Sequence, residues 1–402
     1  MMTKSNKDEV RVLQTISGLI VQSGGPSFST SSLMEGLRKI GANVDLLTVR
    51  PASPSDVNLG KGCPWLKEVA NDYCRPFFFS RNAQLFLAEQ DYDLFHCNGL
   101  WMGINHETCS IARRRNLPYV ISPHGMLYPS ALRVHAWKKM MLRTLWYNRD
   151  ILQATCLHVT CRQELEHCRN FGYRGPIAVI PNPVTIPQAT EWKEEAAGEN
   201  DCRRIGFLGR LHPIKKVEHL LYALALLTDE ERKKIQLQIM GSGDSRYTHF
   251  LKTEVKRLCI EKEVEFVGFV EGEEKFRMLS ALSALMVPSE QENFGMIVPE
   301  ALVCGTPVYA SLGTPWSDLG LRHCGWWRDN KPETIAQTIR EIIGLPNSVL
   351  KEMGSNGRKL VEEKYEQLKV AQMTKQLYEW VVKDRLAPEF RPEFVDVFRG
   401  LL

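Results

Sequence analysis

The sequence predicts an α/β protein with two domains, each built around a largely parallel sheet. Short apolar runs of strand length alternate with amphipathic stretches of helical length, the pattern of repeated βαβ units. Glycine- or proline-containing turns follow several of these runs, and a polar stretch near residue 190 separates two such series. A length of 402 residues is enough for two or three domains with cores of their own.

The domain boundaries follow from where this alternation stops and restarts. We expect residues 1–187 to form the first domain and residues 201–358 the second. The stretch 188–200, QATEWKEEAAGEN, is polar and irregular, which is typical of a linker. Residues 359–402 follow, with a long helical pattern over 359–382 and a tail whose helical face carries Phe394, Val397, Phe398 and Leu401.

The first domain is expected to open with a strand at Thr15–Val21, a glycine-rich turn and a helix from about Ser29 to Ile40. Residues 51–80 are interrupted by proline and glycine and should be irregular, with the aromatic run Phe77–Phe79 in the core. Further strands are expected from residue 44 and at Tyr92–His96, Tyr119–Ser122, Cys156–Thr160 and Ile177–Ile180.

The second domain restarts the same alternation. Its strands are expected at Arg204–Leu208, Leu237–Met240, Val264–Gly268, Leu285–Val287 and Val308–Ala310. Helices are expected between them, including one that begins near Gly295, holds Pro299 in an early turn and stops at Gly305.

Composition excludes several classes of protein. A net charge of +4 argues against a dedicated nucleic-acid binder, and no apolar run approaches the roughly 18–20 residues that span a bilayer. The polar N-terminus has no signal-peptide core, and eleven scattered cysteines without a C-x-x-C pair indicate reduced thiols. We therefore expect a cytoplasmic protein with no metal site.

The stretch 287–310, VPSEQENFGMIVPEALVCGTPVYA, carries the strongest chemical signal. Glu292 lies on the loop after a strand, and Glu300 lies about two turns further on. Carboxylates in these places suit the hydroxyls of a sugar and of a ribose, and the N–H groups around Gly295 suit a phosphate or sugar oxygen. For two glutamates alone, a solvated surface would be the better interpretation.

Three further places could carry chemistry, each with a simpler alternative. Gly24 and Gly25 form a turn after the first strand that lets a ligand approach the backbone, although tight turns use glycine for themselves. Arg210 and Lys215 follow the first strand of the second domain and suit a diphosphate, although surface cations are usually only solvated. His124 follows a strand and precedes a glycine, although a lone histidine is more often structural.

The stretch around Glu292 and Glu300 resembles the E-x7-E motif of retaining GT-B glycosyltransferases of family 4. The match includes Glu292-Asn293-Phe294-Gly295, Pro299-Glu300-Ala301-Leu302 and Cys304-Gly305-Thr306-Pro307-Val308, and the resemblance extends over nearly the whole chain. It implies two Rossmann-like domains facing a cleft: an acceptor-side domain first and a nucleotide-sugar domain second. It also implies that the last helix crosses back to the first domain.

The resemblance also assigns roles to residues. His124, Arg210, Lys215 and Glu292 take the catalytic positions, with Arg210 and Lys215 on the diphosphate; Lys216 stands where the family usually has glycine, so either lysine could make that contact. Glu300 binds the ribose. The remaining positions assigned to donor binding are Gly24, Gly25, Phe269, Val270, Asn293, Phe294, Gly295, Met296 and Ile297.

The function implied is transfer of a sugar from a UDP- or GDP-sugar to a saccharide or lipid-linked acceptor, with retention of configuration and without a metal or other cofactor. The form of residues 122–127, SPHGML, is similar to that of bacterial polysaccharide-assembly members. A nucleotide-sugar epimerase on the same fold and a non-catalytic sugar-binding module remain alternatives. A nicotinamide oxidoreductase is disfavoured because the glycine turn lacks the G-x-G-x-x-G fingerprint.

Residues 130–150 form a candidate basic amphipathic helix, in which arginines and lysines interleave with leucine, methionine and tryptophan. Such a helix either packs on its own domain with a solvated basic face or contacts anionic lipid at the inner face of the cell membrane. The tail 388–402 leaves the same choice open, with packing on the parent chain as the default.

Overall fold

The computed structural model describes residues 9–20, 24–53, 56–72, 79–187, 202–385 and 387–398. The predicted linker 188–200, Val21, Phe77 and Phe78, and Leu401 lie outside the described residues. The chain divides into two compact units. Unit 1 comprises residues up to Thr185 and from Gln367 onward, and unit 2 comprises Ile186–Glu366.

Unit 1 is built on a sheet of eight described strands, in the order β14-β7-β6-β5-β4-β1-β2-β3. Neighbouring strands are parallel except β14, which pairs antiparallel with β7. The central strands are short and fully buried, as apolar strands covered on both faces must be. The bounds are β1 Val12–Ile16, β2 Val44–Val49, β3 Leu66–Val69, β4 Leu94–Asn98, β5 Tyr119–Ser122, β6 Cys156–Val159, β7 Ile177–Val179 and β14 Val395–Asp396.

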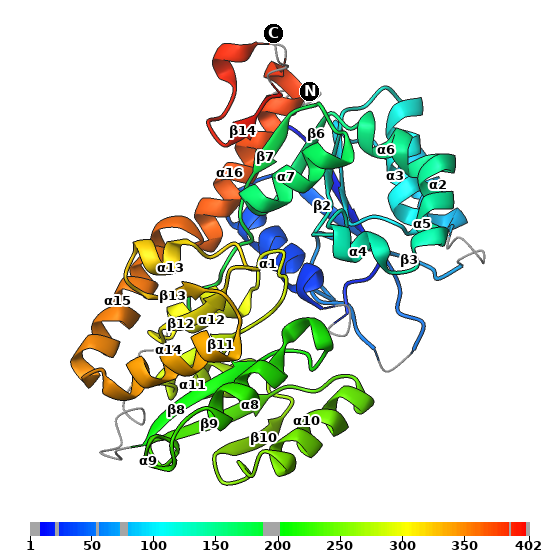
Figure 1. Cartoon of the computed structure of the whole chain (residues 1–402). Helices are drawn as coiled ribbons and strands as arrows, with labels where there is room; N and C mark the ends of the chain where they lie inside the picture. Colours follow the sequence, from blue (N-terminus) through cyan, green and yellow to red (C-terminus); the bar gives the residue numbers. More distant parts are fainter. Residues whose placement is uncertain are drawn as a thin grey trace. The chain divides into compact units, whose positions relative to one another are not determined.

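Helices cover both faces of this sheet (Figure 1). One face packs against α2 (Arg81–Glu89), α3 (Gly103–Arg114), α6 (Asn148–Leu152) and α7 (Arg162–Phe171). The other packs against α1 (Gly25–Lys39) and the C-terminal helix α16 (Gln367–Glu379). The alternation of side chains along each strand therefore assigns every second residue to α1 and α16.

Unit 2 has six described strands, all parallel, in the order β10-β9-β8-β11-β12-β13. The strand bounds are β8 Arg203–Leu208, β9 Ile235–Met240, β10 Val264–Gly268, β11 Ala284–Val287, β12 Val308–Ser311 and β13 Gly325–Arg328. The helices are α8 Val217–Ala225, α9 Asp229–Arg232, α10 Ser245–Arg257, α11 Gly272–Ser280, α12 Ile297–Val303, α13 Asp318–Leu321, α14 Pro332–Gly344 and α15 Asn347–Lys364.

The first strand lies earlier than predicted. It runs over Val12–Ile16 rather than Thr15–Val21. Gln14 and Thr15 look unsuited to a buried strand, but both are fully buried and hydrogen-bonded, Gln14 to Tyr378 and Thr15 to Thr108. Hydrogen-bond partners far away in sequence therefore allow these polar side chains to be buried in the strand, which their polarity alone argued against.

The predicted helix over 359–382 is two helices. α15 ends at Lys364 and α16 begins at Gln367, where the chain leaves unit 2 for unit 1. On one side of the break the Tyr365 ring packs against Phe294 and Trp316 of unit 2. On the other, Gln367 Nε2 donates to the Ser32 carbonyl of unit 1 at 2.9 Å. The two anchors explain why the helix is interrupted there.

The described part of the C-terminal tail is not the predicted helix. A 3-10 turn at Pro388–Phe390 leads into β14, which extends the sheet of unit 1, and Arg169 pairs with Asp396 at 2.7 Å. The segment up to residue 398 therefore packs on its parent chain.

The predicted basic helix at 130–150 is also broken. α4 (Pro129–Arg133) is separated from α5 (Ala136–Leu142) by His135, which adopts a left-handed conformation with φ 51°. A π-helical turn at Arg143–Tyr147 then connects α5 to α6. The extra residue in that turn rotates the helix face, so Tyr147 is buried while Leu145 is exposed.

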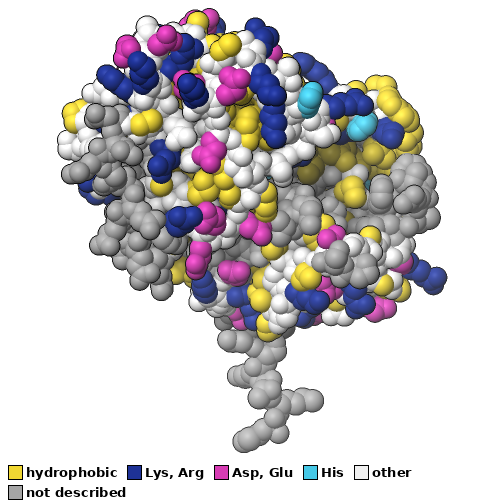
Figure 2. Space-filling model, turned by 90° about the horizontal axis from the view of Figure 1, so that it is seen from below, with side chains coloured by type: hydrophobic (Ala, Val, Ile, Leu, Met, Phe, Trp, Pro, Cys, Tyr) yellow, Lys and Arg dark blue, Asp and Glu magenta, His cyan; other side chains and the backbone are white. Residues whose placement is uncertain are grey.

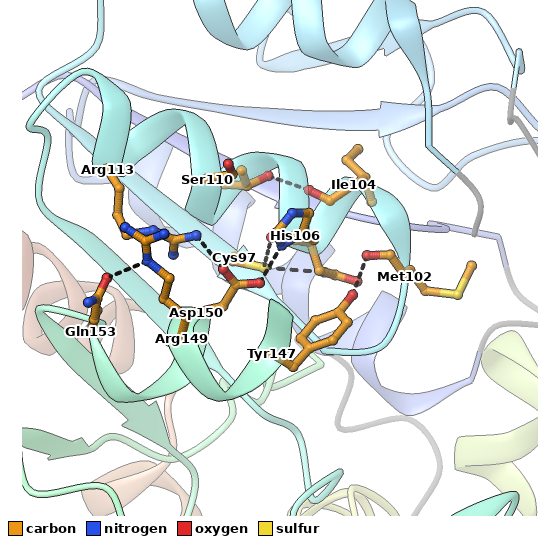
Figure 3. A network of polar contacts seen from close by, with 12 residues as sticks. Cys97, Met102, Ile104, His106, Ser110, Arg113, Tyr147, Arg149, Asp150 and Gln153 are labelled. Carbon is orange, nitrogen blue, oxygen red and sulfur yellow. Dashed lines mark hydrogen bonds and ion pairs between the residues drawn. The ribbon is translucent and has the colours of Figure 1, made fainter. Parts of the chain in front are cut away.

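A buried polar cluster fastens the end of this segment to α3 (Figure 3). Asp150 accepts a hydrogen bond from Arg113 at 2.6 Å and contacts His106 Nδ1 at 2.7 Å. Tyr147 donates to the Met102 carbonyl at 2.7 Å. The segment is thus held by α6 and Tyr147, whereas α5 has no buried residue.

Candidate functional site

The loop after β11 carries the first carboxylate of the motif. Glu292 Oε1 accepts a hydrogen bond from Ser289 Oγ at 2.7 Å and forms an ion pair with Lys215 Nζ. The Glu292 backbone N–H donates to the Gly313 carbonyl at 3.0 Å, which ties this loop to the one after β12. Both ends of Glu292 are therefore fixed, and its carboxylate is directed at the predicted phosphate-binding lysine.

Lys215 lies on a 3-10 turn, Pro213–Lys215, that follows β8. The next residue, Lys216, adopts a left-handed conformation with φ 52° and pairs instead with Glu290 at 3.1 Å. The change of backbone direction separates the two lysines, and Lys215 is the one that reaches Glu292. Arg210 is exposed and makes no ion pair within the described part of the chain.

Two glycines allow the loops of this site to pack backbone against backbone. A Cβ on Gly241 would lie 1.9 Å from the Gly209 carbonyl oxygen, and a Cβ on Gly313 would lie 2.0 Å from the Glu290 carbonyl oxygen. No side chain fits at such distances. The loops bearing Arg210 and Glu292 are held by these contacts.

The second carboxylate of the motif lies in the first turn of α12. Glu300 Oε1 accepts a hydrogen bond from Lys275 of α11 at 2.9 Å, and both side chains are about one-fifth exposed. Lys275 was not predicted as a site residue, because its sequence neighbourhood, GEEKFR, looks like a solvated helix face. Ser289, also missed, lies three positions before Glu292.

The residues between the two carboxylates divide into a buried anchor and partly exposed backbone. Phe294 is 5% exposed and packs against Trp316, whose indole N–H donates to the Phe294 carbonyl at 2.5 Å. Gly295 has φ 75°, and Asn293, Met296 and Ile297 are partly buried. The backbone N–H groups of residues 294–297 have no acceptor among the described residues.

Phe269 and Val270 follow β10 directly. The Phe269 side chain is 62% exposed and Val270 is partly buried. An exposed phenylalanine at the carboxyl end of a parallel strand is placed where ligands of such sheets bind.

In unit 1, His124 follows β5 in a left-handed conformation with φ 49°. Its Nε2 lies 3.2 Å from Asn98 Oδ1 at the end of β4, and burial lowers the pKa of His124 to about 3, with a smaller contribution from His158. The next residue, Gly125, donates its N–H to Glu164 at 2.5 Å. Glu164 is buried and also accepts from the Thr160 N–H, so one carboxylate fixes the loop that presents His124.

Gly24 caps the N-terminus of α1 with φ 81° and ψ −155°, a conformation that requires glycine, and Gly25 is the first helical residue. Among the described residues, a Cβ on either would meet no atom within 4 Å. His124, Gly24 and Gly25 thus belong to unit 1, and the other predicted site residues belong to unit 2.

Two kinds of feature are absent from the described residues. No group of three or more His, Cys, Asp or Glu side chains there could hold a metal ion. No described helix is both long and apolar enough to cross a membrane.

Family models match both halves of the chain. Residues 24–183 match the glycosyl transferase 4-like domain, and residues 188–360 match glycosyl transferases group 1. The chain belongs to the group 1 glycosyltransferases of family 4. It is therefore a glycosyltransferase, which sets aside the epimerase and binding-module alternatives.

Individual proteins similar to this glycosyltransferase are consistent with the family assignment. An uncharacterised glycosyltransferase of Methanocaldococcus jannaschii is 25% identical over 382 residues, covering 88% of this chain and 94% of that protein. Sucrose-phosphate synthase of Thermosynechococcus elongatus matches with TM-score 0.73 and 20% identity, covering 92% of this chain and 99% of that one. Anabaena HepE, solved with UDP-glucose, matches with TM-score 0.71 and 17% identity over the same shares. These structures show that the fold is GT-B.

Proposed function

We propose that unit 2 binds a nucleotide-diphosphate sugar and that the enzyme transfers the sugar, with retention of configuration, to a saccharide or lipid-linked saccharide. The observation that carries the proposal is the ion pair between Lys215 and Glu292. A lysine and a carboxylate from separate loops are both held where the strands of a parallel sheet end. Such a pair offers a cation to a diphosphate and a carboxylate to a sugar hydroxyl.

Each proposed contact follows from the placement of a residue. The diphosphate replaces Glu292 as the ion-pair partner of Lys215. The exposed Arg210 guanidinium adds a bidentate contact to the same diphosphate. Glu292, released from Lys215, accepts a hydrogen bond from the sugar. Glu300 accepts from the ribose hydroxyls, Phe269 lies against the base, and the N–H groups of residues 294–297 donate to the ligand.

Stabilisation of the negative charge on the leaving diphosphate is the catalytic contribution that these residues can make. Arg210 and Lys215 stabilise the charge that develops as the sugar–phosphate bond breaks. In this proposal no metal ion is required, so turnover should persist when a chelator is present. A loss of turnover in chelator that added magnesium restores would contradict it.

We propose cell-surface polysaccharide assembly as the process served, because residues 122–127 resemble members of that type. The HepE complexes with UDP and UDP-glucose make UDP-glucose the first donor to test. WaaG, another GT-B structure, is a glycosyltransferase involved in lipopolysaccharide biosynthesis, which makes lipid-linked saccharides the first acceptors to test.

We also propose that α5 contacts anionic lipid heads. Trp137 is 65% exposed and Met140 67% exposed, and no acidic residue occurs between Pro129 and Arg149. Figure 2 shows hydrophobic side chains gathered beside Lys, Arg and His at the right-hand edge of the face that it draws. Exposed apolar side chains among unopposed cations suit a negatively charged membrane surface.

A thermal-shift comparison tests the donor site. UDP, GDP and their sugars are added to wild type, to Glu300→Ala and to a control, Glu290→Ala. The control removes a carboxylate of the loop after β11 that is 64% exposed and pairs with Lys216. At one hundred times Kd a ligand adds about 2.7 kcal/mol to the free energy of unfolding. We expect one nucleotide to raise the Tm of wild type and Glu290→Ala and to raise that of Glu300→Ala less. If none of them shifts wild type, the donor proposal is wrong.

A further inference from the structure

A row of polar side chains crosses the carboxyl end of the unit 1 sheet, on the face that packs against α1 and α16. Gln14 lies beside His96, its partner in the β1–β4 register, and Asn98 lies beside Ser122 in the β4–β5 register. His158 continues the row on β6. Earlier residues on the same face, such as Val12 and Val120, are apolar and belong to the core. The face therefore changes from apolar to polar where the strands approach His124.

These side chains form one continuous chain of hydrogen bonds from His124 to the Ile180 carbonyl. The consecutive contacts are His124 Nε2 to Asn98 Oδ1, 3.2 Å; Asn98 Nδ2 to Gln14 Oε1, 2.9 Å; Gln14 Nε2 to Tyr378 Oη, 2.8 Å; Tyr378 Oη to His96 Nδ1, 2.8 Å; His96 Nε2 to Ser122 Oγ, 2.7 Å; Ser122 Oγ to His158 Nδ1, 3.0 Å; and His158 Nε2 to Ile180 O, 3.0 Å.

The carbonyl end fixes the direction of the chain. The Ile180 oxygen can only accept, so His158 carries its proton on Nε2. Burial lowers the pKa of His158 to about 4, which keeps it neutral and leaves Nδ1 as an acceptor. Ser122 must donate its one proton to that nitrogen. Its oxygen therefore accepts from His96, which carries its own proton on Nε2.

The same reasoning continues through Tyr378. His96 is fully buried, and desolvation, with a smaller contribution from His158, holds its pKa well below the ordinary value; Nδ1 is then an acceptor for the Tyr378 hydroxyl. That hydroxyl has no second proton, so Gln14 must turn its amide N–H toward it. The Gln14 oxygen then faces the Asn98 amide nitrogen, and the Asn98 oxygen faces His124 Nε2.

We propose that this chain holds His124 as its Nε2–H tautomer, with Nδ1 presented as an acceptor to a ligand hydroxyl, and that Tyr378 is the positioning residue that transmits the direction fixed at Ile180 to Gln14, Asn98 and His124. Nδ1 of His124 has no hydrogen-bond partner within the part of the chain that the structure describes. The identity of the hydroxyl rests on the proposed function, since a sugar supplies it. The tautomer assignment does not depend on the proposed function.

Tyr378 holds this place because its hydroxyl is the only link that α16 contributes among the described contacts of the chain. Without it, Gln14 loses its acceptor, and the amides of Gln14 and Asn98 are no longer held in one orientation. An Asn98 amide turned over would offer N–H rather than oxygen to His124 Nε2, which favours a proton on Nδ1.

Imidazole ¹⁵N spectroscopy tests the proposal, because protonated and bare ring nitrogens differ in chemical shift. Spectra are recorded for wild type, for Tyr378→Phe and for Tyr92→Phe, which removes another largely buried hydroxyl of unit 1, bonded to Asp45. We expect a proton on Nε2 of His124 in wild type and in Tyr92→Phe, and a share on Nδ1 in Tyr378→Phe. Asn98→Asp added to Tyr378→Phe should return the proton to Nε2, because a carboxylate only accepts.

Two spectroscopic results would overturn the tautomer assignment: a proton on Nδ1 of wild-type His124, or an unchanged His124 spectrum in Tyr378→Phe. The ligand part is tested by turnover of the donor, which we expect to fall about five- to tenfold in Tyr378→Phe, as for the loss of one buried hydrogen bond. Unchanged turnover would overturn that part. If no nucleotide sugar binds wild type, the proposed function fails, while the spectra still decide the tautomer.

Discussion

Lys215 and Glu292 form an ion pair although 77 positions separate them in sequence, and their side chains are only 21% and 13% exposed. Both belong to unit 2, so the pair is a property of that unit. It joins the loop after β8 to the loop after β11. The cation and the carboxylate of the proposed donor site are therefore each other's partner when no ligand is present.

The two members of this pair should respond differently to substitution. We expect Lys215→Met to weaken UDP binding about 10- to 100-fold, because a hydrogen bond to a charged group contributes about 1.5–3 kcal/mol. Glu292→Gln should leave UDP binding unchanged or tighter, since it releases Lys215, but should lower turnover of the nucleotide sugar. Calorimetric titration with UDP and a turnover assay measure the two effects. Lys216→Met, beside the site, is the control; equal losses in Lys215→Met and Lys216→Met would contradict the assignment.

The packing of the loops can be tested at Gly313. An added Cβ would lie 2.0 Å from the Glu290 carbonyl oxygen, so Gly313→Ala must displace the loop that carries Glu292. We expect a loss of about 1–3 kcal/mol in the free energy of unfolding, as for overpacking, together with weaker UDP binding. Gly344→Ala, where an added Cβ meets no atom within 4 Å, should do neither. Denaturant unfolding with and without UDP provides the measurement, and native-like values for Gly313→Ala would refute the packing argument.

Acid should destabilise unit 1 through its buried histidines. The pKa of His158 is depressed to about 4 in the folded protein, below its ordinary value of 6.5, so the unfolded chain binds more protons between these values. Its stabilising effect is complete above pH 6.5 and is lost as the pH falls toward 4. Between pH 6.5 and pH 5 the loss is roughly 2 kcal/mol for this one group.

Thermal unfolding from pH 7 to pH 5 checks this, with His158→Gln as the comparison, since glutamine keeps a donor for the Ile180 carbonyl. The variant should be less stable at pH 7 but lose less Tm on acidification. A variant with the same pH slope as wild type would show that His158 does not titrate as argued.

The proposed lipid contact predicts selective binding to vesicles. Wild type should float with phosphatidylglycerol-containing vesicles and not with pure phosphatidylcholine, and less so at high salt. Trp137→Ser with Met140→Ser should reduce binding severalfold, and Lys138→Glu should act in the same direction. Leu321→Ser removes a side chain of α13 that is 74% exposed and should have no effect. Equal flotation of wild type and the Trp137 variant would exclude α5 as the contact.

Sequence patterns predicted strands correctly where nearby residues decide the structure. β5 and β10 have the predicted bounds. The predictions were wrong where a distant partner decides the structure. β1 begins earlier because Gln14 is satisfied by Tyr378, 364 positions away, and the long C-terminal helix breaks because Tyr365 and Gln367 are anchored to different units.

The site residues also divide into those that the sequence indicated and those that only the fold reveals. Motif spacing drew attention to Glu292, Glu300, Arg210 and Lys215, and the structure joins Glu292 to Lys215. It could not indicate Lys275 or Glu164, because lysine and glutamate within helices are usually solvated and only the fold brings them to Glu300 and Gly125. The roles of the predicted residues in binding and catalysis remain predictions that the experiments above address.

Because of the C-terminal segment, the two units become complete at different times during synthesis. Unit 2 is one uninterrupted stretch and can fold once its residues have left the ribosome. Unit 1 must wait for α16 and β14, because α16 covers a sheet face that includes His96 and Ala178, and β14 completes the sheet edge at β7. Until then the first half of the chain carries an apolar face that only α1 covers and an open strand edge, the surfaces on which chaperones act. A chain released after residue 366 would contain all of unit 2 but only part of unit 1.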